Sequence, residues 1–305
     1  MRILIVPASP QTSRTTIHNL LTTPQKQDPI HIRGLYRNLT RVPPEFQTNP
    51  NFESYPGDLS DPATLNFHSF DTVFFVLPPC YDGTNLLQWA TTVSTNVRLA
   101  IQRSGTVKRL VLLSSMGAEF EGGTGEIMTN HISEEILKDA ASEVIIMRCA
   151  YFMENWAAAV ETVRSDRPYL ETVITPVEFA VPMVAVKDIG YHSMQSILMD
   201  KVPQTPYVFE LQGPRDYTPV DVQRAFEKVL GRQVELRPVA KENLEEFFGR
   251  FLPKVAVGPF VEMTLSFLPG GVMHTDAKKR EGVKVYRGEM ELEEVVSRLL
   301  SHAGG

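Results

Sequence analysis

The opening of the chain constrains the fold more than any other stretch. The first fourteen residues read MRILIVPASPQTSR, an apolar strand that runs into a turn and then into a helical pattern. A strand followed at once by such a turn and a helix begins a dinucleotide-binding βαβ unit, with the pyrophosphate on the helix N-terminus. The turn positions that hold glycine in such units are Pro7, Pro10 and Ser13 here. Because proline fixes φ and has no N–H to donate, the sequence predicts the architecture together with a weakened cofactor turn.

Strands and helices alternate over the first half of the 305-residue chain. Apolar runs typical of strands lie at 3–6, 30–36, 52–56, 71–79, 107–115 and 143–149, and helical patterns lie at 13–21, 83–103, 126–141 and 152–163, with another helix start at 61–62. This spacing requires parallel strands joined by right-handed crossovers. We therefore predict an α/β fold, a Rossmann-like doubly wound parallel sheet over 1–167. A smaller C-terminal substrate-binding α/β portion is predicted over 168–305, with some segments returning to the core sheet.

Composition and charge argue against several classes of protein. The net charge of −6 comes from interspersed signs without a basic stripe, so nucleic acid is not expected as a partner. No run reaches the roughly 18 to 20 apolar residues of a membrane span, and no membrane partner is expected. Cys80 and Cys149 form neither a disulfide framework nor a zinc site, so we expect buried thiols and no metal. Since the first residues already read as a strand, we expect no secretory segment and a cytoplasmic protein.

A series of short motifs carries a family resemblance. In chain order they are GDLSDPATL, VFFVLPP, VKRLVLLSSMGA, HISEEILK, MRCAYFMENW, VPMVAVKDIG and LQGPRDYTPVDV. Together they cover most of the chain, and the sequence resembles the NmrA-like family of atypical short-chain dehydrogenases. Within that family it is most similar to the festuclavine-dehydrogenase-like branch of fungal alkaloid pathways.

The resemblance implies an NADP-type Rossmann domain with the ligand lying between it and a small substrate domain. Arg37 matches the arginine that meets the 2′-phosphate in such proteins, where a guanidinium gives bidentate contacts. Asp58 and Leu59 match the residues that flank the adenine, and Leu77 and Pro78 would lie along the nicotinamide ribose.

The side chains of the opening turn offer partial compensation for its two prolines. Hydroxyls and one guanidinium beside the helix N-terminus could contact the phosphates: Ser9, Thr12, Ser13 and Arg14. We therefore expect NADP(H) to bind weakly or to have been lost.

Four polar side chains are the candidate catalytic groups. Tyr81 follows the fourth strand, His131 lies in the helix after the fifth, and Tyr151 and Asn155 follow the sixth. The carboxyl ends of parallel strands meet at the edge where doubly wound folds bind ligands. We predict that these four side chains converge on one cleft at that edge.

The family's usual acid is missing. No Tyr-x-x-x-Lys pair follows the fifth strand, and Asn130 stands where many relatives have a lysine. His131 could move a proton near neutral pH, because Glu134 lies on the same helical face and could orient it. The alternative is that His131 caps the helix start while Glu134 pairs with Lys138 at the surface.

The run FLPKVAVGPFVEMTLSFLPGGVM at 251–273 has two readings, the lining of a pocket for an apolar ligand or plain core packing.

Three functions follow from the whole sequence. The first is an NADP(H)-dependent oxidoreductase that acts on an apolar polycyclic small molecule of specialised metabolism. The second is a redox-neutral isomerase, cyclase or dehydratase that has lost the dinucleotide. The third is a non-catalytic NADP-sensing regulatory protein.

Overall fold

The computed structural model describes residues 1–24, 30–276 and 281–302, and its centre is an eight-stranded sheet. The strand order is β13-β10-β6-β5-β4-β1-β2-β3, and every neighbouring pair is parallel. The strands are β1 (Arg2–Val6), β2 (His31–Tyr36), β3 (Phe52–Pro56), β4 (Thr72–Val76), β5 (Arg109–Ser115), β6 (Glu143–Cys149), β10 (Tyr207–Gln212) and β13 (Lys284–Arg287). The predicted doubly wound parallel sheet is confirmed.

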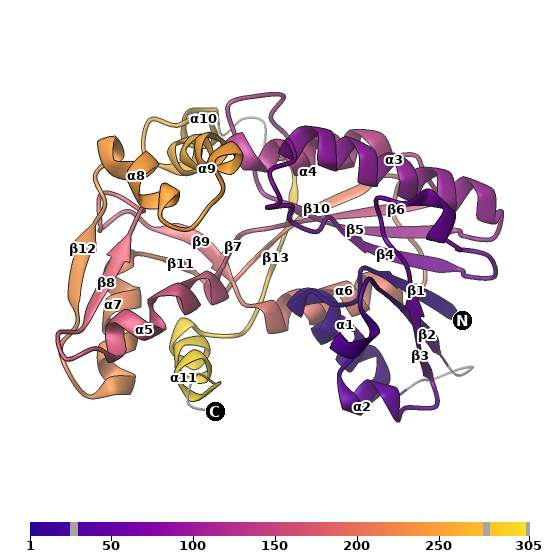
Figure 1. Cartoon of the computed structure of the whole chain (residues 1–305), viewed down its shortest axis with the longest axis horizontal. Coiled ribbons are helices and arrows are strands. Elements are labelled where there is room, and N and C mark those ends of the chain that lie inside the picture. Colours follow the sequence, from indigo (N-terminus) through magenta and orange to yellow (C-terminus); the bar gives the residue numbers. More distant parts are fainter. Residues whose placement is uncertain (25–29, 277–280, 303–305) are drawn as a thin grey trace.

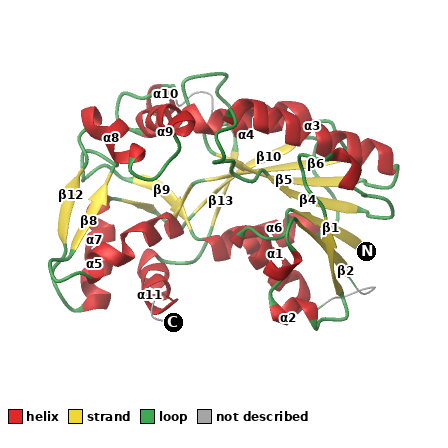
Figure 2. Ribbon diagram, in the orientation of Figure 1, coloured by secondary structure: helices red, strands yellow, loops and turns green. Residues whose placement is uncertain are grey.

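Helices cover both faces of this sheet (Figures 1 and 2). One face carries α3 (Leu86–Ser104) and α4 (Met128–Leu137), and the other carries α1 (Gln11–Thr22) and α6 (Val186–Ile197). The central strands are buried on both faces, which explains why their sequences are continuous apolar runs. On one side α1 and α6 touch closely, since a Cβ added at Gly190 would lie 2.4 Å from Thr15 Cγ2. A short α2 (Pro44–Gln47) and two 3₁₀ turns, η1 (Leu39–Arg41) and η2 (Pro62–Thr64), complete this part.

The C-terminal part adds two small sheets. One contains β7 (Tyr151–Phe152), β9 (Val181–Val184) and β11 (Asp216–Tyr217), and the other pairs β8 (Tyr169–Thr172) with β12 (Glu235–Pro238). The helices around them are η4 (Met153–Ala159), α5 (Val160–Arg164), α7 (Pro219–Leu230), η5 (Lys241–Asn243), α8 (Leu244–Gly249), α9 (Lys254–Phe267), α10 (Val272–Thr275) and α11 (Leu292–His302). Segments α6, β10 and β13 return to the main sheet, and a domain boundary at 167/168 stays a prediction.

Two predicted helices differ from the structure. The helix expected at 152–163 is instead a strand residue followed by η4 and α5, because Phe152 pairs with Val184 of β9. The helix expected after Asp61 is only the single turn η2, where the Asp61 side chain accepts the Ala63 amide. In both places local hydrogen bonding or strand pairing takes precedence over the helical pattern.

Candidate functional site

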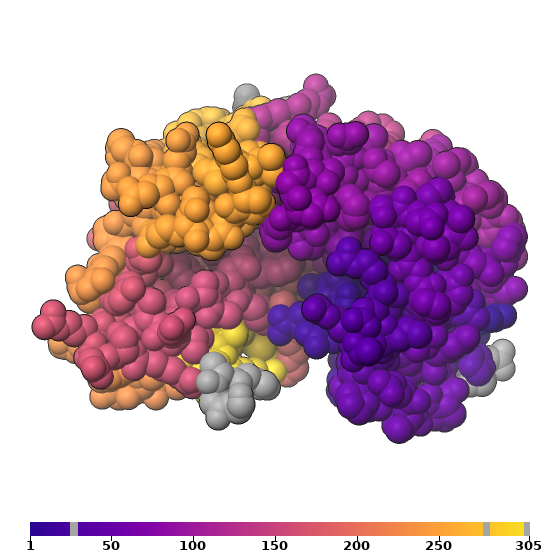
Figure 3. Space-filling model, viewed as in Figure 1, coloured from indigo at the N-terminus to yellow at the C-terminus, as the bar shows by residue number. Residues whose placement is uncertain are grey.

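A cavity of about 660 Å³ lies at the carboxyl edge of the main sheet, where the N-terminal and C-terminal parts meet. Its walls come from the ends of β4, β5 and β6, the start of α1, β7 with η4, and α9. The space-filling view shows the surface hollowed between the N-terminal part and the orange α8–α9 segment (Figure 3). Strand order reverses between β1 and β4, which is where doubly wound folds place their ligands.

The start of α1 opens on this cavity through Pro10, Gln11 and Thr12. Helix α1 begins at Gln11. The first amide of this helix that donates a hydrogen bond to a backbone carbonyl is that of Arg14, which bonds to the Pro10 carbonyl at 2.9 Å. The amides of the three preceding residues form no hydrogen bond with any described residue; they are Gln11, Thr12 and Ser13. The helix N-terminus therefore presents unsatisfied donors and partial positive charge to the cavity.

This donor set fits the phosphates of a dinucleotide, with two limits. Pro10 is the N-cap of α1 and gives neither an N–H nor a side-chain cap. Pro7 is buried, and the next amide, Ala8 N–H, is already bonded to the Leu35 carbonyl at 2.8 Å. The phosphate donors therefore reduce to the first-turn amides, the Thr12 hydroxyl and nearby guanidinium groups.

The structure brings only some of the predicted cofactor residues to the cavity. Thr12 and Leu77 line it, and Pro78 lines a small adjoining cavity of about 110 Å³. Three of the predicted cofactor residues are solvent-exposed and do not line the cavity: Ser9, Arg14 and Arg37. The Asp58 carboxylate is bound within its own turn, accepting from the amide and hydroxyl of Ser60. Two residues are buried away from the cavity, namely Ser13 and Leu59.

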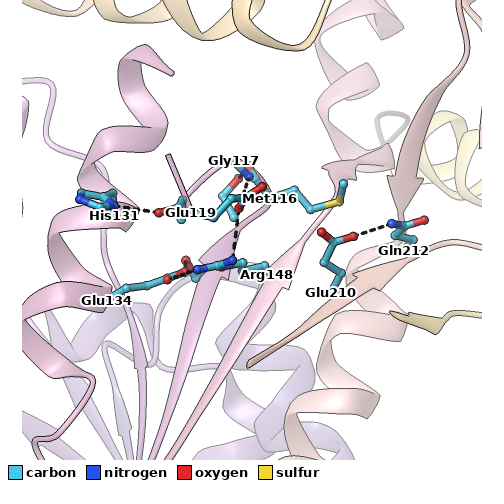
Figure 4. A network of polar contacts seen from close by, with 11 residues as sticks. Met116, Gly117, Glu119, His131, Glu134, Arg148, Glu210 and Gln212 are labelled. Carbon is cyan, nitrogen blue, oxygen red and sulfur yellow. Dashed lines mark hydrogen bonds and ion pairs between the residues drawn. The ribbon is translucent and has the colours of Figure 1, made fainter. Parts of the chain in front are cut away.

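Three of the four candidate catalytic side chains share the cavity: Tyr81, Tyr151 and Asn155. Burial raises the pKa of Tyr151 to about 12, and a hydrogen bond with Asn155 opposes part of that rise, so the phenol stays protonated at neutral pH. His131 is not part of the lining, since its Nδ1 is tied to the Ala118 carbonyl at 2.9 Å (Figure 4). The expected convergence therefore holds for three side chains, while His131 is turned to the adjacent backbone.

A buried polar network lies directly beneath the cavity (Figure 4). The Ser114 hydroxyl, which lines the cavity, donates to Glu134 Oε1 at 2.6 Å. Arg148 of β6 donates to both oxygens of Glu134, at 3.0 and 2.6 Å, and contacts Glu119 Oε2 at 3.3 Å. The Ser114 proton is thereby directed at Glu134, so this hydroxyl can only accept from a ligand in the cavity.

The surface pairing expected for Glu134 is wrong. Glu134 is buried, and Lys138 pairs instead with Glu135 at 2.7 Å. A signal for this network was present in the sequence, because Arg148 interrupts an otherwise apolar strand and a buried guanidinium needs a carboxylate.

Two further carboxyl groups line the cavity and had no predicted role. Both oxygens of Glu154 accept the Val186 amide, at 2.9 and 3.0 Å, which satisfies the first N–H of α6 where Ala185 offers no side-chain cap. Glu126 lies in η3 (Gly125–Ile127). Burial raises the pKa of Tyr81, and the proximity of Glu126 adds to that rise. Burial raises the pKa of both carboxyl groups.

The apolar segment at 251–273 forms the far wall. Phe260, Met263, Phe267 and Met273 line the cavity, as the pocket-lining reading expects, while neighbouring side chains of α9 pack on α8. The stretch Lys254–Thr275 has the length and the mean hydropathy, 1.4, of a membrane span. In this structure the stretch is two helices, α9 and α10, and the first packs against η3.

Neither a protein-family model nor a curated protein matches the chain. Among solved structures, triphenylmethane reductase from Citrobacter sp. in complex with NADP(H) has a TM-score of 0.72 at 17% identity, with 98% of this chain and 100% of that chain covered. An NADPH-dependent quinone oxidoreductase from Escherichia coli in complex with NADPH has a TM-score of 0.71 at 18% identity, covering 97% and 99%.

The negative transcriptional regulator NmrA has a TM-score of 0.68 at 16% identity, covering 99% of this chain and 96% of that chain. At such identities the likeness establishes the fold alone, and none of these neighbours is a festuclavine dehydrogenase. The chain therefore has the Rossmann-like architecture found in NmrA and in NADP(H)-binding reductases.

Proposed function

We propose that this chain is an NADP(H)-dependent oxidoreductase whose cavity takes an apolar polycyclic small molecule of specialised metabolism. The observation that carries the proposal is the composition of a single cavity. One end is the open N-terminus of α1, and the opposite wall is the apolar face of α9. A phosphate-binding end joined to an apolar chamber suits a dinucleotide and an apolar substrate held together.

The dinucleotide would be held by residues at the N-terminus of α1 and by Arg37, which follows β2. The amides of Gln11 and Thr12 and the Thr12 hydroxyl would bind the pyrophosphate, and Arg37 would bind the 2′-phosphate. Leu77 and the end of β5 would lie against the nicotinamide end. When bound, the cofactor supplies or accepts a hydride.

The chain's own side chains supply the rest of the chemistry. The apolar wall of Phe260, Met263 and Phe267 excludes water from the reacting groups and holds a large apolar ligand. Tyr151 keeps its proton and can donate a hydrogen bond to a polar atom of the substrate, with Asn155 fixing the phenol.

Calorimetric titration with NADPH, NADH and NADP⁺ tests this function. We expect weak binding that favours NADPH over NADH, because two prolines remove N–H donors while Arg37 remains available. Turnover of NADPH with an apolar carbonyl or quinone probe would support the oxidoreductase. Absence of any dinucleotide binding would contradict it.

Two other functions have specific support. The fold likeness to NmrA and the missing Tyr-x-x-x-Lys pair favour a non-catalytic NADP sensor, for which NADPH would bind without turnover of any probe. Pro7 and Pro10 favour a redox-neutral isomerase, cyclase or dehydratase, for which apolar ligands would bind and NADPH would not. In the two enzyme proposals the partner is a small-molecule substrate, whereas the sensor would also bind a regulatory partner. None of the three requires nucleic acid or a membrane. A cytoplasmic location is part of the proposal.

A further inference from the structure

Glu126 is held at the cavity wall by an unusually close backbone contact. The preceding residue, Gly125, has a φ of +57° and lies against α9. A Cβ added there would be 2.1 Å from the Pro259 carbonyl oxygen and 2.4 Å from the Met263 amide nitrogen, so only glycine fits. The position of Glu126 relative to the apolar wall is therefore fixed by the backbone and not by a flexible loop.

Glu126 also lies where two cavities meet. The main cavity of about 660 Å³ and the adjoining cavity of about 110 Å³ share a short set of lining residues: Leu77, Pro79, Tyr81, Glu126 and Asn130. Glu126 carries the carboxyl group of this shared set. The smaller cavity has room for several water molecules, and Glu126, Tyr81 and Asn130 offer them polar partners. One carboxyl group can therefore face both a ligand and a water-sized side chamber.

The surroundings of Glu126 favour its protonated form. Burial raises the pKa of this carboxyl, a hydrogen bond with Thr129 opposes part of the rise, and among the described residues no lysine or arginine lines the main cavity. Among the described residues, the other titratable groups that line the two cavities or lie beside Gly125 are Cys80, Tyr81, Cys149, Tyr151, Glu154, His274 and, on α9, Glu262.

Three other polar groups of the cavity already have hydrogen-bond partners within the protein. The Ser114 proton is directed at Glu134, and Glu154 spends both oxygens on the Val186 amide. Tyr151 has a pKa of about 12, which makes it a hydrogen-bond donor that is slow to ionise. Glu126 is the lining carboxyl group that lies at both cavities, where it can exchange a proton with water.

We propose that Glu126 is the proton-transfer residue of this cavity and that the smaller cavity is its route to solvent. The inference rests on the proposed function and adds a catalytic residue to it. As a hydride reaches the carbon of a substrate carbonyl, the oxygen gains negative charge. The Glu126 O–H bond then breaks, a substrate O–H bond forms, and the carboxylate regains a proton from bulk solvent, relayed by water molecules in the smaller cavity so that no hydroxide is left behind. In the oxidative direction each of these steps is reversed.

A carbon-13 NMR titration of glutamate side chains tests the protonation state directly, whether or not any cofactor binds. The protein is labelled at glutamate Cδ, and the Glu126 resonance is the one missing in Glu126→Gln. We expect that resonance to titrate at higher pH than those of exposed glutamates. The matched control is Glu121→Gln, which removes an exposed carboxyl five residues earlier and should leave the Glu126 resonance in place.

A second readout separates this proposal from the proposed function. In Glu126→Gln we expect NADPH affinity within twofold of the unchanged protein, turnover reduced at least a hundredfold, and loss of the pH dependence that Glu126 imposes. The proposal would be overturned if Glu126 titrated in the same pH range as the exposed glutamates, or if Glu126→Gln left turnover and its pH profile unchanged. Neither result would contradict the proposed oxidoreductase function. Failure of NADPH to bind the unchanged protein would instead remove the proposed function.

Discussion

The Ser114 hydroxyl donates a 2.6 Å hydrogen bond to Oε1 of Glu134, which links the end of β5 to α4 beneath the cavity. Glu134 in turn holds Arg148 through both of its oxygens. A buried ion pair therefore lies behind Ser114 in the cavity wall, and its carboxylate joins α4 to both β5 and β6. Removing that carboxylate takes away both of these hydrogen bonds from a buried guanidinium and leaves it a longer contact with Glu119, at 3.3 Å.

Replacing Glu134 by Gln should destabilise the protein by about 3 kcal/mol, the cost of breaking a buried ion pair. Glu135→Gln is the matched control, because the neighbouring residue makes an exposed pair with Lys138 and should cost under about 1 kcal/mol. Urea unfolding of the two variants measures both values. Equal losses for the two positions would contradict the buried role of Glu134.

The contact between Gly125 and α9 gives a second prediction. Gly125→Ala should cost about 2 kcal/mol or more, since the added methyl meets the α9 backbone at a positive φ. Gly122→Ala is the control, as a Cβ there meets nothing within 4 Å, and it should change stability by less than about 0.5 kcal/mol. Thermal unfolding compares the two variants. A fully tolerated Gly125→Ala would show that α9 does not pack as closely as described.

The Glu154 carboxyl predicts a pH dependence of stability. Burial raises its pKa in the folded state, with the Val186 amide opposing part of the rise, whereas an unfolded glutamate titrates at about 4.3. A group with a raised folded pKa stabilises below the unfolded pKa, and that contribution is lost as pH rises through the folded pKa. Relative to Glu154→Gln, the unchanged protein should therefore lose stability as pH increases from about 4 upward.

Unfolding free energies of both proteins between pH 4 and pH 8 measure this difference. The free-energy gap should move steadily in favour of Glu154→Gln as pH rises. A gap that is constant with pH, or that moves the other way, would show that the Val186 amide dominates and holds the carboxylate charged.

The opening turn predicts a gain of function. Pro10→Gly restores an N–H at the N-cap of α1 and should strengthen NADPH binding by about 1.5 kcal/mol, roughly tenfold. Adding Pro7→Gly should strengthen it further. Pro43→Gly, at the N-cap of α2 away from the cavity, is the control and should leave NADPH affinity unchanged. Calorimetry that finds no difference among these variants would place the pyrophosphate away from the α1 N-terminus.

The sequence predicted the main sheet well, because its central strands are buried on both faces and appear as uninterrupted apolar runs. It also predicted that Tyr81, Tyr151 and Asn155 share a cavity, since each follows a strand of that sheet. The misses have a common cause in tertiary partners that no local pattern reveals. Phe152 lies in a strand that pairs with Val184 and not in the predicted helix. Glu134 is buried and bonded to Arg148, where a surface pair with Lys138 had been the alternative. The role of Glu126 depends on Gly125 meeting α9 across more than 130 residues of chain.

In the proposed function, the pyrophosphate of the dinucleotide binds at the N-terminus of α1 and its 2′-phosphate binds Arg37. Nitrogen-15 NMR of the amides of Gln11, Thr12 and Ser13 during titration with NADPH tests it most directly. We expect saturable chemical-shift changes of these amides with NADPH and weaker ones with NADH. Arg37→Ala should lose that preference, and the exposed control Arg41→Ala should keep it. NADPH binding that leaves the three amides unmoved, or no binding at all, would contradict it.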